Sequence, residues 1–153
     1  MIIPEDIYSQ IVRLMPIPCV DIIVENEQGR VLLVKRTDEP AKGEWWFPGG
    51  RVHYLETRVQ AAVRKVREEC GLEASRLREL GTYDVILEIP GDISPRHGIT
   101  TLFQVRVGEQ HDFTLDIRGF DVDWRLPGDW SREKLHFFVR QGLQFLVKPA
   151  NEY

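Results

Sequence analysis

The sequence predicts an α+β protein in which a mixed β-sheet lies between helices, an α/β/α sandwich. Two observations support this fold class. Short β-branched runs bounded by turn residues alternate with segments of helical periodicity. Strands flank one highly charged helix, and further helical segments occur toward both ends of the chain. With 153 residues, 42% of them hydrophobic, we expect a single domain that spans residues 1–153.

The first expected elements are a helix and a hairpin. Residues 5–15 carry apolar side chains at helical spacing and stop before Pro16, which predicts a short amphipathic helix. Two roles fit it, a cap on the fold and a contact in a dimer. Residues 19–26 and 29–36 are β-branched runs separated by a short turn, so they predict an antiparallel hairpin. A loop, residues 37–46, follows.

The rest of the chain predicts two helices and three strands. The charged helix runs from Thr57 to Cys70, and the strands are expected at residues 77–89, 99–107 and 119–126. Residues 131–147 have apolar side chains at helical spacing and predict a closing helix on the core. Gly142 interrupts that apolar stripe, at a cost of roughly 0.5–1 kcal/mol relative to alanine.

Composition excludes several classes of function. The net charge is -4 and the pI about 5.6, so the surface lacks the positive excess that binds nucleic acid backbones. The N-terminal residues contain neither a basic signal-peptide segment nor the roughly 20 apolar residues that span a bilayer. We therefore expect a cytoplasmic protein with no nucleic-acid or membrane partner. Cys19 and Cys70 lack metal-type spacing and are interpreted as reduced thiols.

The charged helix admits a simple structural explanation. Arg64 and Lys65 each precede a glutamate by four residues, Glu68 and Glu69 respectively. Such i,i+4 pairs on a solvated face contribute about 0.2–0.5 kcal/mol each. The opposite face carries an apolar stripe that is expected to pack on the sheet. The stripe comprises Val59, Ala62, Val63, Val66 and Cys70.

The residues just before this helix favour a metal site instead. Residues 48–50, Pro-Gly-Gly, predict a tight turn with exposed backbone carbonyls, and Glu56 stands immediately ahead of the helix. Glu68 and Glu69, together with a loop carbonyl, offer the oxygen ligands that Mg²⁺ or Mn²⁺ prefers. Such a site would leave positions for water and phosphate.

Residues 50–72 resemble the Nudix box. The matching residues are Gly50, Glu56, Arg64, Val66, Glu68, Glu69, Gly71 and Leu72. The resemblance implies a Nudix-type sandwich and a metal-dependent hydrolase, using Mg²⁺ or Mn²⁺, of a nucleoside diphosphate linked to another moiety. It also implies that Glu68, Glu69 and the carbonyl of Gly49 bind the metal, and that Glu56 and Arg64 form a structural ion pair. Lys65 stands where the family usually has a glutamate, and one role open to it is to neutralise Glu69.

The chain ahead of the box, above all residues 34–51, is similar to GDP-mannose mannosyl hydrolases. In that subfamily water attacks C1 of the sugar and GDP leaves. Arg36 and Arg51 match its diphosphate-binding arginines, and a guanidinium fork can hold phosphate oxygens and stabilise the charge of a leaving diphosphate. The same resemblance implies a homodimer.

The sequence departs from this subfamily at the general base. Gly119 falls where the subfamily has the base histidine, and a glycine has no side chain to accept a proton. His111 is the first candidate to replace it. Other candidate bases are Glu68, Asp112, Asp116 and Asp121, with His53 and His97 as weaker ones. Catalytic roles are therefore expected for Glu68, Arg51 and His111.

Three functions remain open. The first is a magnesium-dependent hydrolase of a nucleotide sugar such as GDP-mannose, which releases GDP and the sugar. The second is a pyrophosphatase that attacks phosphorus in ADP-ribose, a nucleoside triphosphate or a similar compound, and the absent histidine favours it. The third is a nucleotide-binding protein without catalysis, which Lys65 favours.

Overall fold

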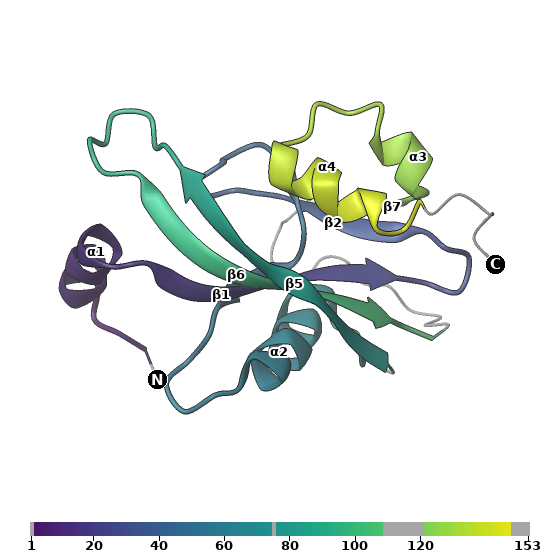
Figure 1. Ribbon diagram of the computed structural model, residues 1–153, viewed down its shortest axis with the longest axis horizontal. Coiled ribbons are helices and arrows are strands. Elements are labelled where there is room, and N and C mark those ends of the chain that lie inside the picture. The colour runs from purple at the N-terminus through teal and green to yellow at the C-terminus, as the bar shows by residue number, and fades with distance from the viewer. Residues whose placement is uncertain (1, 75, 109–120, 148–153) are drawn as a thin grey trace.

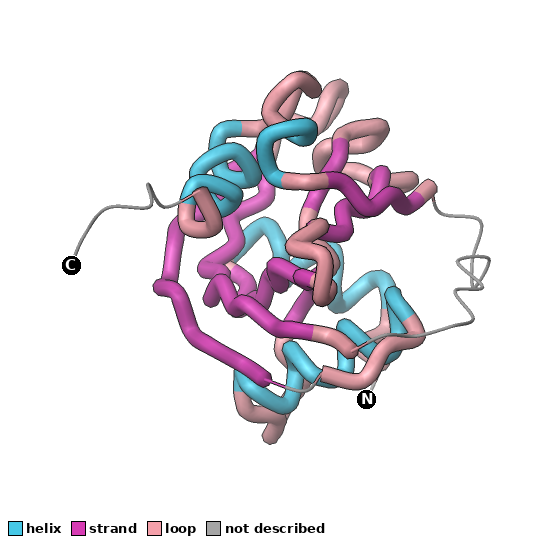
Figure 2. Tube along the Cα trace, turned by 90° about the vertical axis from the view of Figure 1, so that its right-hand side faces the viewer, coloured by secondary structure: helices cyan, strands magenta, loops and turns pink. Residues whose placement is uncertain are grey.

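A twisted mixed β-sheet forms the centre of the computed structural model, which describes residues 2–74, 76–108 and 121–147 (Figure 1). Helix α2 (Arg58–Cys70) covers one face of the sheet, and α3 (Pro127–Trp130) and α4 (Phe137–Gln144) cover the other. Helix α1 (Glu5–Leu14) lies at the end of the sheet where β1 and β6 begin. A view turned by 90° shows helices on both sides of the strands (Figure 2).

The seven strands of the described residues form one sheet, in the order β3-β2-β1-β6-β5, with β4 paired to β1 and β7 paired to β2. Strands β1 and β6 run parallel, whereas the other pairings within this part of the chain are antiparallel. The strands are β1 (Ile17–Glu25), β2 (Val31–Lys35), β3 (Trp45–Trp46), β4 (Gly49–Arg51), β5 (Arg76–Leu87), β6 (Arg96–Arg106) and β7 (Val122–Arg125).

The central strand β1 is buried on both faces, which explains its nearly continuous apolar sequence. Its residues Val20, Ile22 and Val24 pack under α2, because successive strand residues point to opposite faces. Ile23 packs on the other side, in the cluster that contains Phe138 of α4. The alternation of side chains along β1 thus provides an apolar surface for a helical layer on each face of the sheet.

The α+β class with a mixed sheet is confirmed, but three expected elements were wrong in detail. Residues 37–46 are not entirely a loop, because Trp45–Trp46 forms β3 and pairs with β2. The Pro-Gly-Gly segment is not a tight turn, because Gly49–Arg51 forms β4 and pairs with residues 19–21 of β1. The closing helix is shorter than residues 131–147: α3 and α4 are separate, and residues 131–136 connect them. Leu135 continues the apolar spacing from this connection and packs in the core without being helical.

Gly142 of α4 is required by packing. A Cβ at this position would lie 2.7 Å from Cε2 of Phe47, closer than carbon atoms approach in folded proteins. The glycine therefore lets α4 lie directly on Phe47. None of the helices in the described ranges is both long enough and apolar enough to cross a membrane.

Candidate active site

Helix α2 begins and ends with residues suited to those positions. The Thr57 hydroxyl accepts a hydrogen bond from the Gln60 amide (3.1 Å), and the Gln60 side chain accepts one from the Thr57 amide (2.8 Å). At the other end Gly71 takes a left-handed conformation with φ 65°, and its N–H donates to the Arg67 carbonyl (3.0 Å). These caps fix the length of the helix and the position of its charged residues.

The buried side of α2 is rotated slightly from the expected stripe. Ala61, Ala62, Val66 and Cys70 are buried against the sheet, whereas Val59 is 49% exposed. The small side chain of Ala61 lets the helix approach β1 closely. As a result, residues 64, 65, 68 and 69 face β4 and the loop that follows it.

The two glycines of β4 allow this close approach. A Cβ on Gly49 would lie 2.4 Å from the Val20 carbonyl oxygen, and one on Gly50 would lie 3.0 Å from Cε of Lys65. Gly49 therefore lets β4 lie against β1, and Gly50 leaves room for the Lys65 side chain. Neither position accepts a larger residue without movement of its neighbours.

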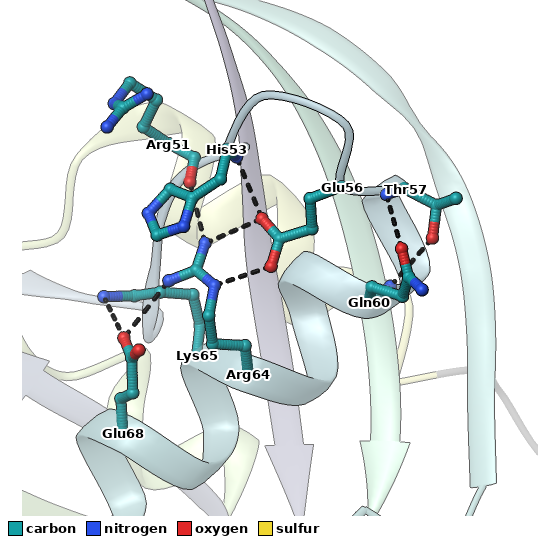
Figure 3. Close-up of polar contacts among 8 residues, drawn as sticks. All are labelled: Arg51, His53, Glu56, Thr57, Gln60, Arg64, Lys65 and Glu68. Atoms are coloured by element: carbon teal, nitrogen blue, oxygen red, sulfur yellow. Dashed lines mark hydrogen bonds and ion pairs between the residues drawn. The ribbon is translucent and has the colours of Figure 1, made fainter. Parts of the chain in front are cut away.

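Glu56 and Arg64 form the most tightly bonded ion pair near β4 (Figure 3). Arg64 donates to the two Glu56 oxygens over 2.6 and 3.0 Å, and the His53 amide also donates to Glu56 (2.9 Å). These hydrogen bonds, that from Arg64 above all, lower the pKa of Glu56 to about 2. Arg64 also donates to the backbone carbonyl of Arg51 (3.0 Å), so the pair holds the strand that carries Arg51.

The two glutamates expected to bind metal lie on the last turns of α2. Lys65 Nζ is 2.7 Å from Glu69 Oε1 and 3.8 Å from Glu68 Oε2, so Lys65 does neutralise Glu69. Glu69 Oε2 accepts from the N–H of Gly49 (3.1 Å), and Glu68 accepts from Arg64 (3.1 Å). The amide of Gly49 thus contacts Glu69, and the expected role of its carbonyl as a metal ligand stays a prediction.

The donor set fits one divalent cation of the magnesium type. Within residues 2–74, 76–108 and 121–147, no three His, Cys, Asp or Glu side chains gather as they would around an ion. Mg²⁺ nevertheless binds proteins through one or two carboxylates and completes its shell with water and substrate phosphates. Glu68 and Glu69 supply that number, and the Lys65 ammonium competes for their charge.

Two adjoining pockets form what we call the candidate cleft. The first, of about 260 Å³, includes Glu69, and the second, of about 280 Å³, includes Arg51. Both are lined by Arg36, Phe47, Gly49 and Gly50. The cleft therefore connects a carboxylate of α2 with both arginines that the sequence singled out.

Local contacts orient the two arginines. Arg36 Nε donates to the Pro40 carbonyl (2.6 Å), which ties the side chain to the loop after β2. The Arg51 guanidinium lies over the Tyr8 ring, 5.7 Å from its centroid. Tyr8 belongs to α1 and lines the second pocket, so the first helix forms one wall of the cleft.

Asp21 is a buried carboxyl in the cleft that our sequence reasoning missed. It accepts hydrogen bonds from Thr100 Oγ1 (2.6 Å) and from the Trp46 indole (3.2 Å). Burial raises the pKa of Asp21 to about 6, and Glu69 acts in the same direction. The available signal was a single charged residue within the apolar run of β1.

The candidate general bases are only partly placed. His111, Asp112, Asp116 and Gly119 lie outside the described residues. The pKa of His53 is lowered, mainly by burial and then by Arg64. His97 is among the residues that line the second pocket, and its Nε2 lies 3.6 Å from Asp84 Oδ1. The Asp121 carbonyl accepts from the Lys35 amide (2.8 Å), one residue before Arg36.

Similarity to known proteins agrees with this geometry. The low-salt glycan biosynthesis protein Agl8 of Haloferax volcanii is 35% identical over 111 residues, 71% of this chain and 70% of that protein. An RNA pyrophosphohydrolase of Halorhodospira halophila is 45% identical over 148 residues, 89% of this chain and 80% of that one. The crystal structure of a MutT Nudix hydrolase from Burkholderia pseudomallei superposes with a TM-score of 0.70 at 25% identity, covering 88% and 99% of the two chains.

The family model of the NUDIX domain matches residues 15–138, which include β1, all of α2 and the lining of the candidate cleft except Tyr8 and Val12. The charged helix α2, the two glycines of β4 and the sheet are therefore those of a Nudix domain. The chain belongs to the Nudix hydrolase family.

Proposed function

We propose that the chain is a divalent-metal-dependent pyrophosphohydrolase of a nucleoside diphosphate derivative, in which water attacks phosphorus. The observation that carries the proposal is the candidate cleft. Its two adjoining pockets share Arg36, and they include Glu69 at one end and Arg51 at the other. A site for a diphosphate needs carboxylate ligands that hold a metal ion at one side of the diphosphate, and cationic side chains along its length. The similarity to an RNA pyrophosphohydrolase supports cleavage of the same kind of bond.

The arginines bind and polarise the diphosphate in this proposal. A guanidinium presents two parallel N–H groups, which match two phosphate oxygens and stay protonated throughout the reaction. Arg36 is common to both pockets and would contact the bridge between the phosphates, and Arg51 would contact the far phosphate. Both groups stabilise the charge that develops on the leaving phosphate.

The carboxylates of α2 hold the cation and position the water. Glu69 and Glu68 would bind Mg²⁺, which, when bound, offsets phosphate charge and lowers the pKa of coordinated water. Binding requires the Lys65 ammonium to move from its position 2.7 Å from Glu69. Glu68, whose side chain is 42% exposed beside Lys65, would then accept the proton of the attacking water, a role that a solvent-accessible carboxylate can fill.

Glutamine substitutions test the metal carboxylates. Glu69→Gln and Glu68→Gln should each lower kcat/KM for ADP-ribose or a nucleoside triphosphate by roughly 100-fold or more, since even outer-shell changes cost 10- to 100-fold. Glu73→Gln is the matched control, because Glu73 follows the same helix and pairs with Arg67 on the surface. Wild-type rates in a folded Glu69→Gln protein would refute the proposal.

A second candidate, hydrolysis of a nucleotide sugar with release of the nucleoside diphosphate, rests on the far end of the cleft. Asp21 and Thr100 line the second pocket together with Arg51, and a carboxyl and a hydroxyl are groups that hydrogen-bond sugar hydroxyls. The similarity to a glycan biosynthesis protein supports this candidate, as does the resemblance of residues 34–51 to GDP-mannose mannosyl hydrolases. The products separate the two candidates: GDP plus mannose from GDP-mannose would favour the second, whereas GMP plus mannose 1-phosphate would favour the first.

A further inference from the structure

A third pocket, of about 460 Å³, lies where β5 begins and β6 ends. In Figure 1 this end of the two strands is opposite α1 and the β5–β6 turn. The second pocket of the candidate cleft is lined from that opposite end, by Tyr8 of α1, Leu87 of β5 and Arg96 of β6. We call this third pocket the β5–β6 pocket. The residues that matter for its chemistry are Arg76, Arg78, Arg106, Glu25, Gln104 and Phe145.

The strand register brings the arginines together. Arg76 of β5 is directly opposite Arg106 of β6, and Arg78 is opposite Gln104. Residues 76 and 78 share one face of β5, because side chains alternate along a strand. Arg76 and Arg106 are therefore cross-strand neighbours, and like charges at directly opposite positions destabilise a sheet.

Two of the three arginines, Arg76 and Arg78, have no counter-charge among the described residues. Glu25 of β1 is the carboxylate of the pocket: it accepts from Gln104 Nε2 (2.7 Å) and lies 3.8 Å from Arg106 Nε. Arg76 and Arg78 make no ion pair or side-chain hydrogen bond with the rest of the described residues, although the protein has a net charge of -4. A pocket with two guanidinium groups that pair with no carboxylate of the described residues is suited to an anion.

We propose that the β5–β6 pocket binds a phosphate-bearing anion. Phosphate is favoured over a carboxylate because its oxygens can accept from several guanidinium forks at once. Phe145, which is 37% exposed, gives the pocket an apolar wall against which the organic part of a nucleotide can pack. The phosphate itself is the shared chemistry of two sources, free inorganic phosphate and a nucleoside monophosphate.

This site is separate from the candidate cleft. Helix α4 packs between them, since its Phe138, Val139 and Leu143 fill the sheet face together with Leu102 of β6. The β5–β6 pocket shares no lining residue with either pocket of the candidate cleft. The proposal therefore does not depend on which reaction the cleft performs, and anion binding here is expected without a divalent metal.

Calorimetric titration of the full chain in EDTA tests the proposal, with inorganic phosphate and AMP as the two probes. The double variant Arg76→Gln/Arg78→Gln should weaken the binding of both by about tenfold or more, because each charge-assisted hydrogen bond is worth at least that factor. Arg132→Gln removes a cation that is 84% exposed elsewhere and should leave the affinity unchanged.

Equal affinity of the wild type and the Arg76→Gln/Arg78→Gln variant would overturn the proposal. Absence of binding to the wild type at millimolar phosphate and AMP would overturn it as well. Phe145→Ala distinguishes the sources. Weaker AMP binding with unchanged phosphate binding identifies a nucleotide as the ligand, whereas equal effects on both identify the free anion.

Discussion

Replacing Glu56 with glutamine removes the negative charge that holds Arg64 and, through it, the Arg51 carbonyl. The side chains of Glu56 and Arg64 are only 13% and 21% exposed, so solvent screens the pair weakly. The pKa of Glu56 falls from 4.5 to about 2, chiefly through the hydrogen bonds from Arg64. At about 1.4 kcal/mol per pKa unit, the full interaction is worth roughly 3 kcal/mol.

The expected loss of stability is smaller than this upper value. In Glu56→Gln the amide still accepts one hydrogen bond, and Arg64 keeps its contacts with Glu68 and the Arg51 carbonyl. We therefore expect the free energy of unfolding to fall by about 2 kcal/mol at pH 7. For a chain of this size, that change lowers Tm by about 4–8 °C.

The pH dependence gives the sign of the effect. Because the pKa of Glu56 is lowered in the folded protein, the stabilisation is complete above the unfolded pKa of 4.5 and is lost as pH falls toward 2. Between pH 7 and pH 3 the wild type loses about 2 kcal/mol of this stabilisation, so the difference between wild type and variant should fall from about 2 kcal/mol to near zero.

Urea denaturation followed by tryptophan fluorescence measures this difference, since Trp46 and Trp130 are buried. Glu73→Gln serves as the control because its pair with Arg67 is on the surface, and no measurable change is expected there. Equal stability of wild type and Glu56→Gln at pH 7, or the same difference at pH 7 and pH 3, would refute the reasoning.

Three further predictions follow from the cleft and its surroundings. Lys65→Gln should lower the Mg²⁺ concentration that half-saturates the rise in Tm by roughly tenfold, because an ammonium 2.7 Å from Glu69 Oε1 no longer competes. An unchanged midpoint in the metal titration would contradict this. Gly142→Ala should destabilise the protein by about 1 kcal/mol in urea titrations, since overpacking against Phe47 exceeds the gain in helix propensity. A more stable variant would show that Phe47 moves freely. Burial raises the pKa of Asp21 to about 6, so between pH 4 and pH 6 the folded protein keeps a proton that the unfolded chain releases. The free energy of unfolding of the wild type should therefore fall by up to about 3 kcal/mol relative to that of Asp21→Asn as the pH rises from 4 to 7. Urea midpoints of the two proteins that stay parallel over that range would disprove the raised pKa.

Local patterns predicted the elements that have their own periodicity. Helix α1 and the hairpin of β1 and β2 appear within a residue or two of their expected bounds, because apolar spacing and turn residues are local properties. Strand β4 was missed because Pro-Gly-Gly has the composition of a turn. Its strand conformation depends on the approach of Gly49 to the Val20 carbonyl, a contact between distant parts of the chain.

The candidate site likewise combines contacts that the sequence predicted with contacts that depend on packing between distant parts of the chain. The Lys65–Glu69 contact was expected from i,i+4 spacing and is present. The resemblance to the family pointed to Arg36 and Arg51, but their shared cleft with Tyr8 and Asp21 comes from packing of α1, β1 and β4. Asp21 illustrates the limit: in sequence it is one acidic residue, and only its burial with Thr100 and Trp46 gives it a raised pKa.

The most direct test of the central claim is hydrolysis of GDP-mannose and ADP-ribose in water labelled with oxygen-18, in the presence of Mg²⁺, with products analysed by mass spectrometry. Attack at phosphorus predicts nucleoside monophosphate and sugar phosphate, with the label on one of the two phosphates. Label on C1 of free mannose, accompanied by unlabelled GDP, would contradict the account and assign the chain to attack at carbon.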